Sequence, residues 1–256
     1  DWSRNRFTMD KDLSKAVIKT FVELYKKKII YKDRRLVNWD TKLETAISDL
    51  EVEQREVQSN LYYIKYKIND KNEFLTIATT RPETMLGDTA VAVNPNDDRY
   101  KSLIGQDIIV PIVERKVKII SDEFVLTDQG SGALKVTPAH DFNDFEIGKR
   151  HKLKFINIFE KDGKLNNNTP NEFKGLDRFD ARNKIIKILK EKELLVKIEN
   201  IKNSVPYGDR SNSIIEPLLT EQWFADAKFL SKKAVQVVKN KKTNFFPKNW
   251  SKIYFQ

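Results

Sequence analysis

Residues 61–137 contain a series of short hydrophobic segments, and this series limits the possible folds more than any other feature of the chain. Tyr62, Ile64, Tyr66 and Ile68 alternate with other residues, which is the period of a β-strand. The turn residues 69–72 precede a second segment, 74–79, so a hairpin is expected. Further short strands are expected at 89–93, 108–112, 116–120, 124–126 and 133–137. Many strands at this spacing favour a barrel or a strongly bent sheet.

Helical periodicity occurs on both sides of this region and within it. Hydrophobic residues recur at helical spacing in 10–30, 179–192 and 226–239, and a shorter helix is expected from Asp141 to Arg150. A short strand is expected at 35–39 and a final one at 194–201. Residues 204–216 are rich in turn formers and are expected to leave the domain. The chain is therefore expected to be a mixed α/β (α+β) protein.

Composition excludes several kinds of site and leaves one class of partner open. The 256 residues include no cysteine and two histidines, which excludes disulfides and thiolate sites and makes a zinc site unconvincing. No hydrophobic run approaches the roughly 20 residues of a membrane span. A net charge of +10 fits a polyanionic partner such as tRNA, but scattered surface lysines explain it equally well.

The first polar segment of interest, residues 78–84 (ATTRPET), follows directly after a predicted strand. Pro82 disfavours a helical conformation at Arg81, so the chain is expected to turn there and present hydroxyl groups at the strand end. Thr79, Thr80, Arg81 and Thr84 are therefore candidate binding residues. Alternatively, the threonines are ordinary strand formers, and Arg81 and Glu83 face solvent.

The second polar segment, residues 130–144, combines a glycine-rich turn, a strand and the start of a helix. Lys135 and Thr137 point to one face of the strand, and Asp141 and Asp144 lie on one face of the helix. A carboxylate here is a natural partner for an α-ammonium ion. The alternative interpretation makes Asp141 an N-cap and Asp144 its partner in a capping box. His140 is a possible base, although a lone histidine beside a proline is more often structural.

Both segments resemble motifs of the valyl-tRNA synthetase family. Residues 78–91 (ATTRPETMLGDTAV) resemble the threonine-rich peptide of that family, and 135–144 (KVTPAHDFND) its second editing motif. The segments 38–40 with 45–53 and 205–211 with 215–224 resemble the stretches that lead into and out of the same domain. The family's two ATP-site signatures are absent, and the missing start methionine and abrupt end suggest a fragment of a longer chain.

The resemblance implies a β-barrel-like editing domain with peripheral helices, of the type found in class I valyl, isoleucyl and leucyl enzymes. It implies an inserted editing domain at 56–204, a connective segment at 1–55 and a return segment at 205–256. Such a domain removes threonine from mischarged tRNA(Val) by hydrolysis of the aminoacyl ester. The expected partners are the threonine-carrying acceptor end of tRNA(Val) and the rest of the synthetase, in a cytoplasmic monomer with no membrane contact.

The resemblance also assigns roles to residues. It places Asp144 at the substrate α-ammonium, and Thr84, Lys135 and Asp141 around the threonine side chain and the ester. It places Arg81, Thr80 and Thr137 near the terminal adenosine and the attacking water. The predicted catalytic residues are Thr84, Lys135, Asp141 and Asp144. The predicted substrate-binding residues are Thr79, Thr80, Arg81, Thr137 and His140.

No metal or cofactor is expected for editing, and ATP and Mg²⁺ are expected only at the parent enzyme's absent catalytic site. Two alternatives remain open at this point. One is a noncatalytic tRNA-binding module that requires the rest of the enzyme. The other is the editing domain of an isoleucyl or leucyl relative.

Overall fold

The computed structural model describes residues 2–69 and 71–255. These residues divide into two units, one formed by 35–220 and the other by 2–34 together with 221–255. The limits predicted for the inserted domain, 56–204, fall inside the larger unit and stay a prediction. Asp70, in the predicted hairpin turn, lies outside the described residues.

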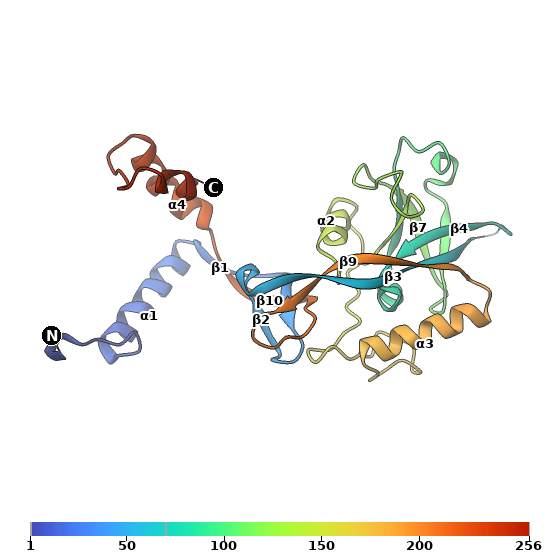
Figure 1. Cartoon of the computed structure of the whole chain (residues 1–256), viewed down its shortest axis with the longest axis horizontal. Helices are drawn as coiled ribbons and strands as arrows, with labels where there is room; N and C mark the ends of the chain where they lie inside the picture. The colour runs from blue at the N-terminus through green and yellow to red at the C-terminus, as the bar shows by residue number, and fades with distance from the viewer. Residues whose placement is uncertain (1, 70, 256) are drawn as a thin grey trace. The chain divides into compact units, whose positions relative to one another are not determined.

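The larger unit is built on a sheet of seven strands (Figure 1). Its strand order is β4-β3-β6-β7-β5-β8, and β9 pairs with β3 outside this path. The strands, in chain order, are β3 (Val52–Ile68), β4 (Phe74–Thr79), β5 (Ala90–Val93), β6 (Asp107–Val110), β7 (Arg115–Ser121), β8 (Ala133–Val136) and β9 (Leu195–Gly208). All pairings are antiparallel except that of β5 with β7.

The sheet curls, because β4 and β8 stand at opposite ends of the strand order and yet approach one another. Its concave core is filled by alternate strand residues such as Ile64, Ile77 and Val91, none of which has any exposed surface. Helix α3 (Arg178–Glu191) covers this core with Ile185 and Leu189. The predicted mixed α/β fold with a bent sheet is confirmed.

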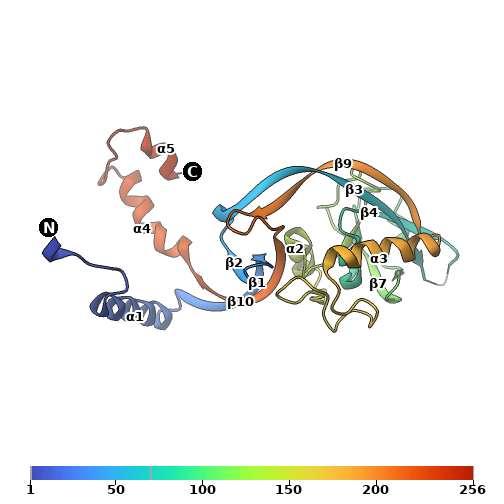
Figure 2. The same ribbon diagram turned by 60° about the horizontal axis from the view of Figure 1, so that its bottom comes forward.

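Figures 1 and 2 show β3 and β9 as one long antiparallel ribbon, with α3 running beside it. Pairing extends from Val52 opposite Gly208 to Ile64 opposite Leu195. The prediction that 204–216 is rich in turns was therefore wrong for 204–208, which continue β9. Pro206 is tolerated there because β9 is an edge strand, where a missing N–H donor leaves no partner unpaired.

A second, three-stranded sheet has the order β10-β1-β2. Its strands are β1 (Ile30–Asp40), β2 (Thr45–Ile47) and β10 (Glu216–Ala225), while single 3₁₀ turns lie at Trp2–Arg4, Asp49–Glu51 and Lys101–Leu103. The smaller unit holds the helices α1 (Lys11–Lys26), α4 (Ala227–Lys239) and α5 (Trp250–Phe255). No helix in the part of the chain that the structure describes is long and apolar enough to cross a bilayer.

Two elements place the functional candidates. The 3₁₀ helix η3 (Pro82–Gly87) follows β4, and α2 (Phe142–Arg150) follows β8. The strand predicted at 124–126 was wrong, because Phe124 and Val125 lie in a turn closed by the Val125 N–H, which donates to the Asp122 carbonyl at 3.2 Å. The Asp122 carboxylate at the start of this turn accepts hydrogen bonds from Arg150 and so holds the turn against α2.

Close packing fixes α2 against the chain that leads out of β8. A Cβ added at Gly148 would lie 2.7 and 2.8 Å from the Cβ and Cγ atoms of Pro138. Gly148→Ala is therefore expected to reduce the free energy of unfolding by about 1–3 kcal/mol through overpacking, despite the better helix propensity of alanine. Urea unfolding measures this change, and a variant as stable as the parent would show that α2 is not packed this tightly.

Candidate functional site

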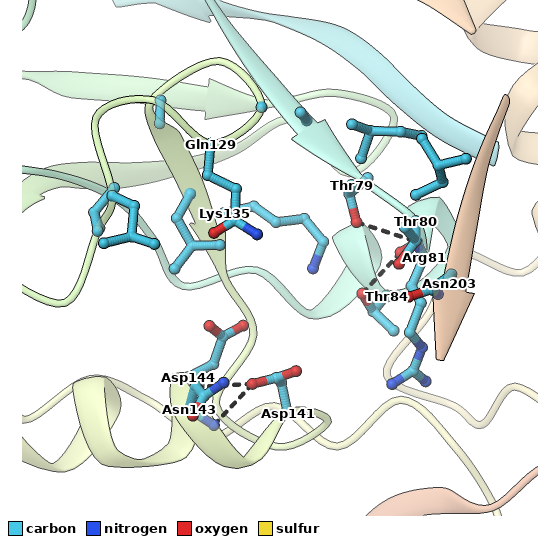
Figure 3. Close-up of a pocket in the computed structure, with 18 of the residues that line it drawn as sticks. Thr79, Thr80, Arg81, Thr84, Gln129, Lys135, Asp141, Asn143, Asp144 and Asn203 are labelled. Carbon is cyan, nitrogen blue, oxygen red and sulfur yellow. Dashed lines mark hydrogen bonds between the residues drawn. The ribbon is translucent and has the colours of Figure 1, made fainter. Parts of the chain in front are cut away.

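A cavity of about 650 Å³ opens between the two polar segments (Figure 3). One wall is the threonine-rich segment at the end of β4, and a second is β8 with the start of α2. The turn at 124–130, Leu61 of β3 and residues 201–203 of β9 complete the lining. Of the nine residues predicted for the site, eight line this cavity: Thr79, Thr80, Arg81, Thr84, Lys135, His140, Asp141 and Asp144.

The threonine-rich wall is held by its own backbone. The Thr79 hydroxyl oxygen accepts a hydrogen bond from the Arg81 N–H at 3.0 Å. The Thr84 hydroxyl and N–H both donate to the Arg81 carbonyl, at 2.9 and 3.1 Å. Pro82 begins η3, so the chain turns at Arg81 as the sequence predicted. Thr80, which is half-buried, is left facing the cavity.

Arg81 and Glu83 do not face solvent, so that alternative interpretation was wrong. The Glu83 carboxylate has no exposed surface and accepts two hydrogen bonds from Arg182, both at 2.7 Å. Burial raises the pKa of Glu83, but the hydrogen bonds and charge of Arg182 outweigh burial and hold that pKa below its ordinary value. Arg81 lies 3.5 Å from the same carboxylate and donates to the His140 carbonyl at 2.9 Å.

A buried polar cluster lies beneath β8. The Asp88 carboxylate accepts hydrogen bonds from the Tyr66 hydroxyl at 2.7 Å, the Thr137 hydroxyl at 2.5 Å and the Lys135 ammonium at 3.3 Å. Burial raises the pKa of Asp88 in spite of these donors. The Thr137 hydroxyl is thus turned into the cluster, and Thr137 is the one predicted residue that does not line the cavity. The cluster fixes the position of the Lys135 ammonium.

Asp141 and Asp144 have different surroundings. Asp141 is the N-cap of α2 and accepts hydrogen bonds from the N–H groups of Asn143 and Asp144, at 2.8 and 3.1 Å. Asp144 does not close a capping box, because its Oδ2 accepts instead from the Thr137 N–H at 2.8 Å. Its Oδ1 accepts no hydrogen bond from any residue within 2–69 or 71–255. Figure 3 shows both carboxylates on the side of the cavity opposite the threonines.

The ionised form of the Asp144 carboxylate is unfavourable in its surroundings. Burial is the main reason that its pKa is raised to about 7, and the nearby Asp141 and Asp88 act in the same direction, while Lys135 and the Thr137 N–H act in the opposite direction. Such a shift at a cavity wall is typical of ligand-binding groups, because an incoming cation relieves the unfavourable charge. The carboxylate is therefore poised to bind a positively charged group.

The His140 imidazole is fully buried and already has a structural partner. Its Nε2 accepts a hydrogen bond from the Ile158 N–H at 2.9 Å. Burial, together with the charge of Arg81, holds the pKa of His140 well below its ordinary value, so the ring is neutral. A further contact of this ring with a ligand stays a prediction.

Comparison with known proteins identifies the family. The sequence profile described as "tRNA synthetases class I (I, L, M and V)" matches residues 1–256. The chain belongs to this class I tRNA synthetase family. It is 68% identical over its whole length to a valine--tRNA ligase of Pelagibacter ubique, of which it covers 29%. It is 53% identical over 278 aligned residues to the enzyme of Bradyrhizobium diazoefficiens, again with all of this chain and 29% of the relative.

A valine--tRNA ligase of Legionella pneumophila (strain Lens) is 53% identical over 256 residues, which are all of this chain and 28% of the relative. The synthetase chain thus spans less than a third of the relatives it matches. A leucyl-tRNA synthetase of Agrobacterium radiobacter, solved in a ternary complex, aligns with 77% of this chain and 33% of its own at 17% identity and a TM-score of 0.42. That likeness is too low to bear on the site.

Several residues of the synthetase site escaped the sequence analysis. Ile201, Lys202 and Asn203 line the cavity because β9 pairs with β3, more than 130 residues earlier in the chain. No local pattern in the sequence indicates that register. Asp88 lies inside the threonine-rich motif at 78–91, and a carboxylate between hydrophobic residues is itself a signal of a buried polar group.

The pKa of Asp144 leads to a prediction about the stability of the synthetase. A folded-state pKa near 7, above the ordinary 3.8, means that the ionised carboxylate destabilises the fold fully above pH 7 and not at all well below pH 4. Asp144→Asn is therefore expected to raise the free energy of unfolding on the order of 2 kcal/mol at pH 8. Urea unfolding at pH 8 and pH 4 checks this, and a variant less stable than the parent at pH 8 would contradict it.

Proposed function

We propose that this cavity hydrolyses the aminoacyl ester of threonine wrongly attached to tRNA(Val). The observation that carries the proposal is the buried Asp144 carboxylate, which keeps one oxygen unpaired by the described residues and faces the threonine-rich wall across the cavity. The identity to valine--tRNA ligases along the whole chain supports the choice of tRNA.

The proposed roles are those that the family resemblance assigns, and the lining of the cavity is compatible with them. The Asp144 carboxylate binds the α-ammonium of the threonyl group through a charge-assisted hydrogen bond. Thr84, Lys135 and Asp141 surround the threonine side chain and the ester, and Thr80 and Arg81 contact the terminal adenosine. Thr79 shapes this wall through its bond to the Arg81 N–H.

The reaction needs no enzyme nucleophile. Water adds to the ester carbonyl carbon and the bond from that carbon to the ribose oxygen breaks. The leaving ribose oxygen takes up the proton that the water loses and becomes a hydroxyl. The products are free threonine and uncharged tRNA. The Lys135 ammonium, held by Asp88 and Thr137, supplies positive charge where the carbonyl oxygen becomes negative.

Specificity has a simple physical basis. Valine and threonine are nearly the same shape, and a hydrophobic pocket rejects an added hydroxyl poorly. A polar site selects threonine over valine, because bound valine would leave buried hydrogen-bonding groups unpaired at a cost of about 1–3 kcal/mol each.

The proposed parent enzyme is a cytoplasmic monomer that ligates valine to tRNA(Val) with ATP and Mg²⁺ at a separate site.

The direct test is deacylation by the chain and by the full-length enzyme from which it comes. Threonyl-tRNA(Val) is expected to be hydrolysed at least about 10²-fold faster than valyl-tRNA(Val), which corresponds to two unpaired groups in the site. Equal rates for the two substrates would reject the proposed specificity. Salt-dependent tRNA binding by the full-length enzyme without deacylation would select a noncatalytic binding module instead.

A further inference from the structure

Glu216, the first residue of β10, lies between two guanidinium groups of the larger unit. Its side chain is 3% exposed. One carboxylate oxygen, Oε1, accepts a hydrogen bond from Nη2 of Arg81. The other, Oε2, accepts from Nη1 of Arg178 at 3.1 Å, and Nη2 of Arg178 also donates to the Ile214 carbonyl at 2.6 Å. A segment more than 130 residues from the threonine-rich wall therefore holds that wall in place.

The guanidinium of Arg81 joins the two walls of the cavity. Its Nη1 donates to the His140 carbonyl, one residue before the cap of α2. The backbone carbonyl of Arg81 accepts both hydrogen bonds from Thr84. A displacement of the Arg81 side chain would therefore reach the start of α2, where Asp141 and Asp144 lie. Two carboxylates hold this guanidinium, Glu83 at 3.5 Å and Glu216 through the hydrogen bond to Nη2.

Arg81 belongs to a network of buried and half-buried ion pairs with an excess of positive charge. In this ion-pair network Arg81, Arg178 and Arg182 give three positive charges and Glu83 and Glu216 give two negative charges, so the network itself carries +1, and Asp141 outside it adds a negative charge that acts on Arg81. Without the charge of Glu216 the network would carry +2 in a setting where the side chains of both carboxylates are at most 3% exposed. Repulsion would then push Arg81, the more exposed of its two partners, toward the cavity.

We propose that Glu216 is a positioning residue for the hydrolytic cavity, which acts by fixing Arg81 between the threonine-rich wall and the start of α2. The inference rests on the proposed function. The ion pair with Arg178 provides an internal comparison, because it uses the same carboxylate on the side away from the cavity. If Glu216 only joined β10 to α3, loss of its partner Arg178 would lower the deacylation rate as much as loss of the Glu216 charge.

The experiment compares Glu216→Gln with Arg178→Met in the full-length enzyme. Single-turnover deacylation of threonyl-tRNA(Val) is measured over a range of enzyme concentrations, below the thermal midpoint of every variant. Glu216→Gln is expected to lower the maximal rate about 10-fold to 10²-fold with a KM within threefold of the parent, because misplacement of a site by about 1 Å has effects of this size. Arg178→Met is expected to stay within threefold of the parent rate.

Each outcome decides between the two claims. A parent enzyme inactive on threonyl-tRNA(Val) overturns the proposed function and this inference with it. An active parent with an unchanged Glu216→Gln rate, or with equal losses in both variants, overturns only the positioning role. If Glu216→Gln does not fold, Glu216→Asp replaces it, since it keeps the charge but retracts the carboxylate by one methylene. Its rate must then fall below that of Arg178→Met for the inference to stand.

Discussion

Replacing Asp144 with alanine is expected to reduce deacylation of threonyl-tRNA(Val) by about 10²–10³-fold. The carboxylate is the proposed partner of the substrate α-ammonium, and truncation of one member of a buried charged pair costs about 2–5 kcal/mol. At 1.36 kcal/mol for each factor of ten, this range corresponds to a loss of about 30-fold to 5,000-fold, and the expected loss lies in its middle. The measurement is the single-turnover rate constant at pH 8, where the carboxylate of the parent is ionised.

Glu146 on the same helix provides the matched control. Its side chain is 59% exposed, pairs with Lys149 on the surface and does not line the cavity. Glu146→Ala is expected to leave the rate within twofold of the parent. Because Asp144→Ala also removes an unfavourable buried charge, it should fold well. A folded Asp144→Ala variant with more than a third of the parent rate would refute the assigned role.

Replacing Glu83 with glutamine should have the largest effect on stability. The buried carboxylate accepts two hydrogen bonds from Arg182 and lies 3.5 Å from Arg81, so its loss leaves two guanidinium groups without their shared anion. Removal of one partner from a buried ion pair typically reduces the free energy of unfolding by about 3–5 kcal/mol. Urea unfolding at pH 7 measures the change.

The pH dependence of this effect has a definite sign. The folded-state pKa of Glu83 is lowered, so its contribution to stability is complete above the ordinary value of 4.5 and is lost as the pH falls through the folded-state value. The difference between parent and Glu83→Gln should therefore shrink in acid. A difference that persists unchanged to pH 2 would show that the charge of Glu83 is not what stabilises the fold.

Glu172 provides the control, because it also forms an ion pair with a residue of α3. It pairs with Lys184 of α3 at 3.3 Å, two residues from Arg182, but its side chain is 52% exposed. Glu172→Gln is expected to change the free energy of unfolding by no more than about 1 kcal/mol, because solvent already screens an exposed pair. Similar losses in both variants would mean that burial does not determine the strength of the Glu83 contacts.

Local patterns were sufficient to predict much of the fold. The strand at 74–79 has the predicted limits, and the helices after Asp141 and near 179–192 begin within one residue of their predicted starts. These elements have strong local signals, namely a period of two or 3.6 residues and a capping side chain. The same reasoning placed Asp141 at the N-cap of α2, where it accepts two backbone hydrogen bonds.

What the sequence could not predict depends on contacts between distant segments. The turn formers of 204–216 suggested turns, but the pairing of Pro206 opposite Gln54 makes it part of an edge strand. Thr137 was expected to face the cavity, yet its hydroxyl donates to Asp88, 49 residues earlier. Glu216 lay in a segment expected to leave the domain, and only the folded chain brings it to Arg81. Charge and polarity identified the residues in each case, but not their partners.

The most direct test of the site is a crystal structure of the chain with a non-hydrolysable threonyl-adenosine analogue. The account predicts that the α-ammonium lies about 2.7–3.0 Å from a carboxylate oxygen of Asp144, with the threonine side chain between Thr84 and Lys135. An analogue bound in the 650 Å³ cavity with its amino group turned away from Asp144, or bound outside that cavity, would contradict it.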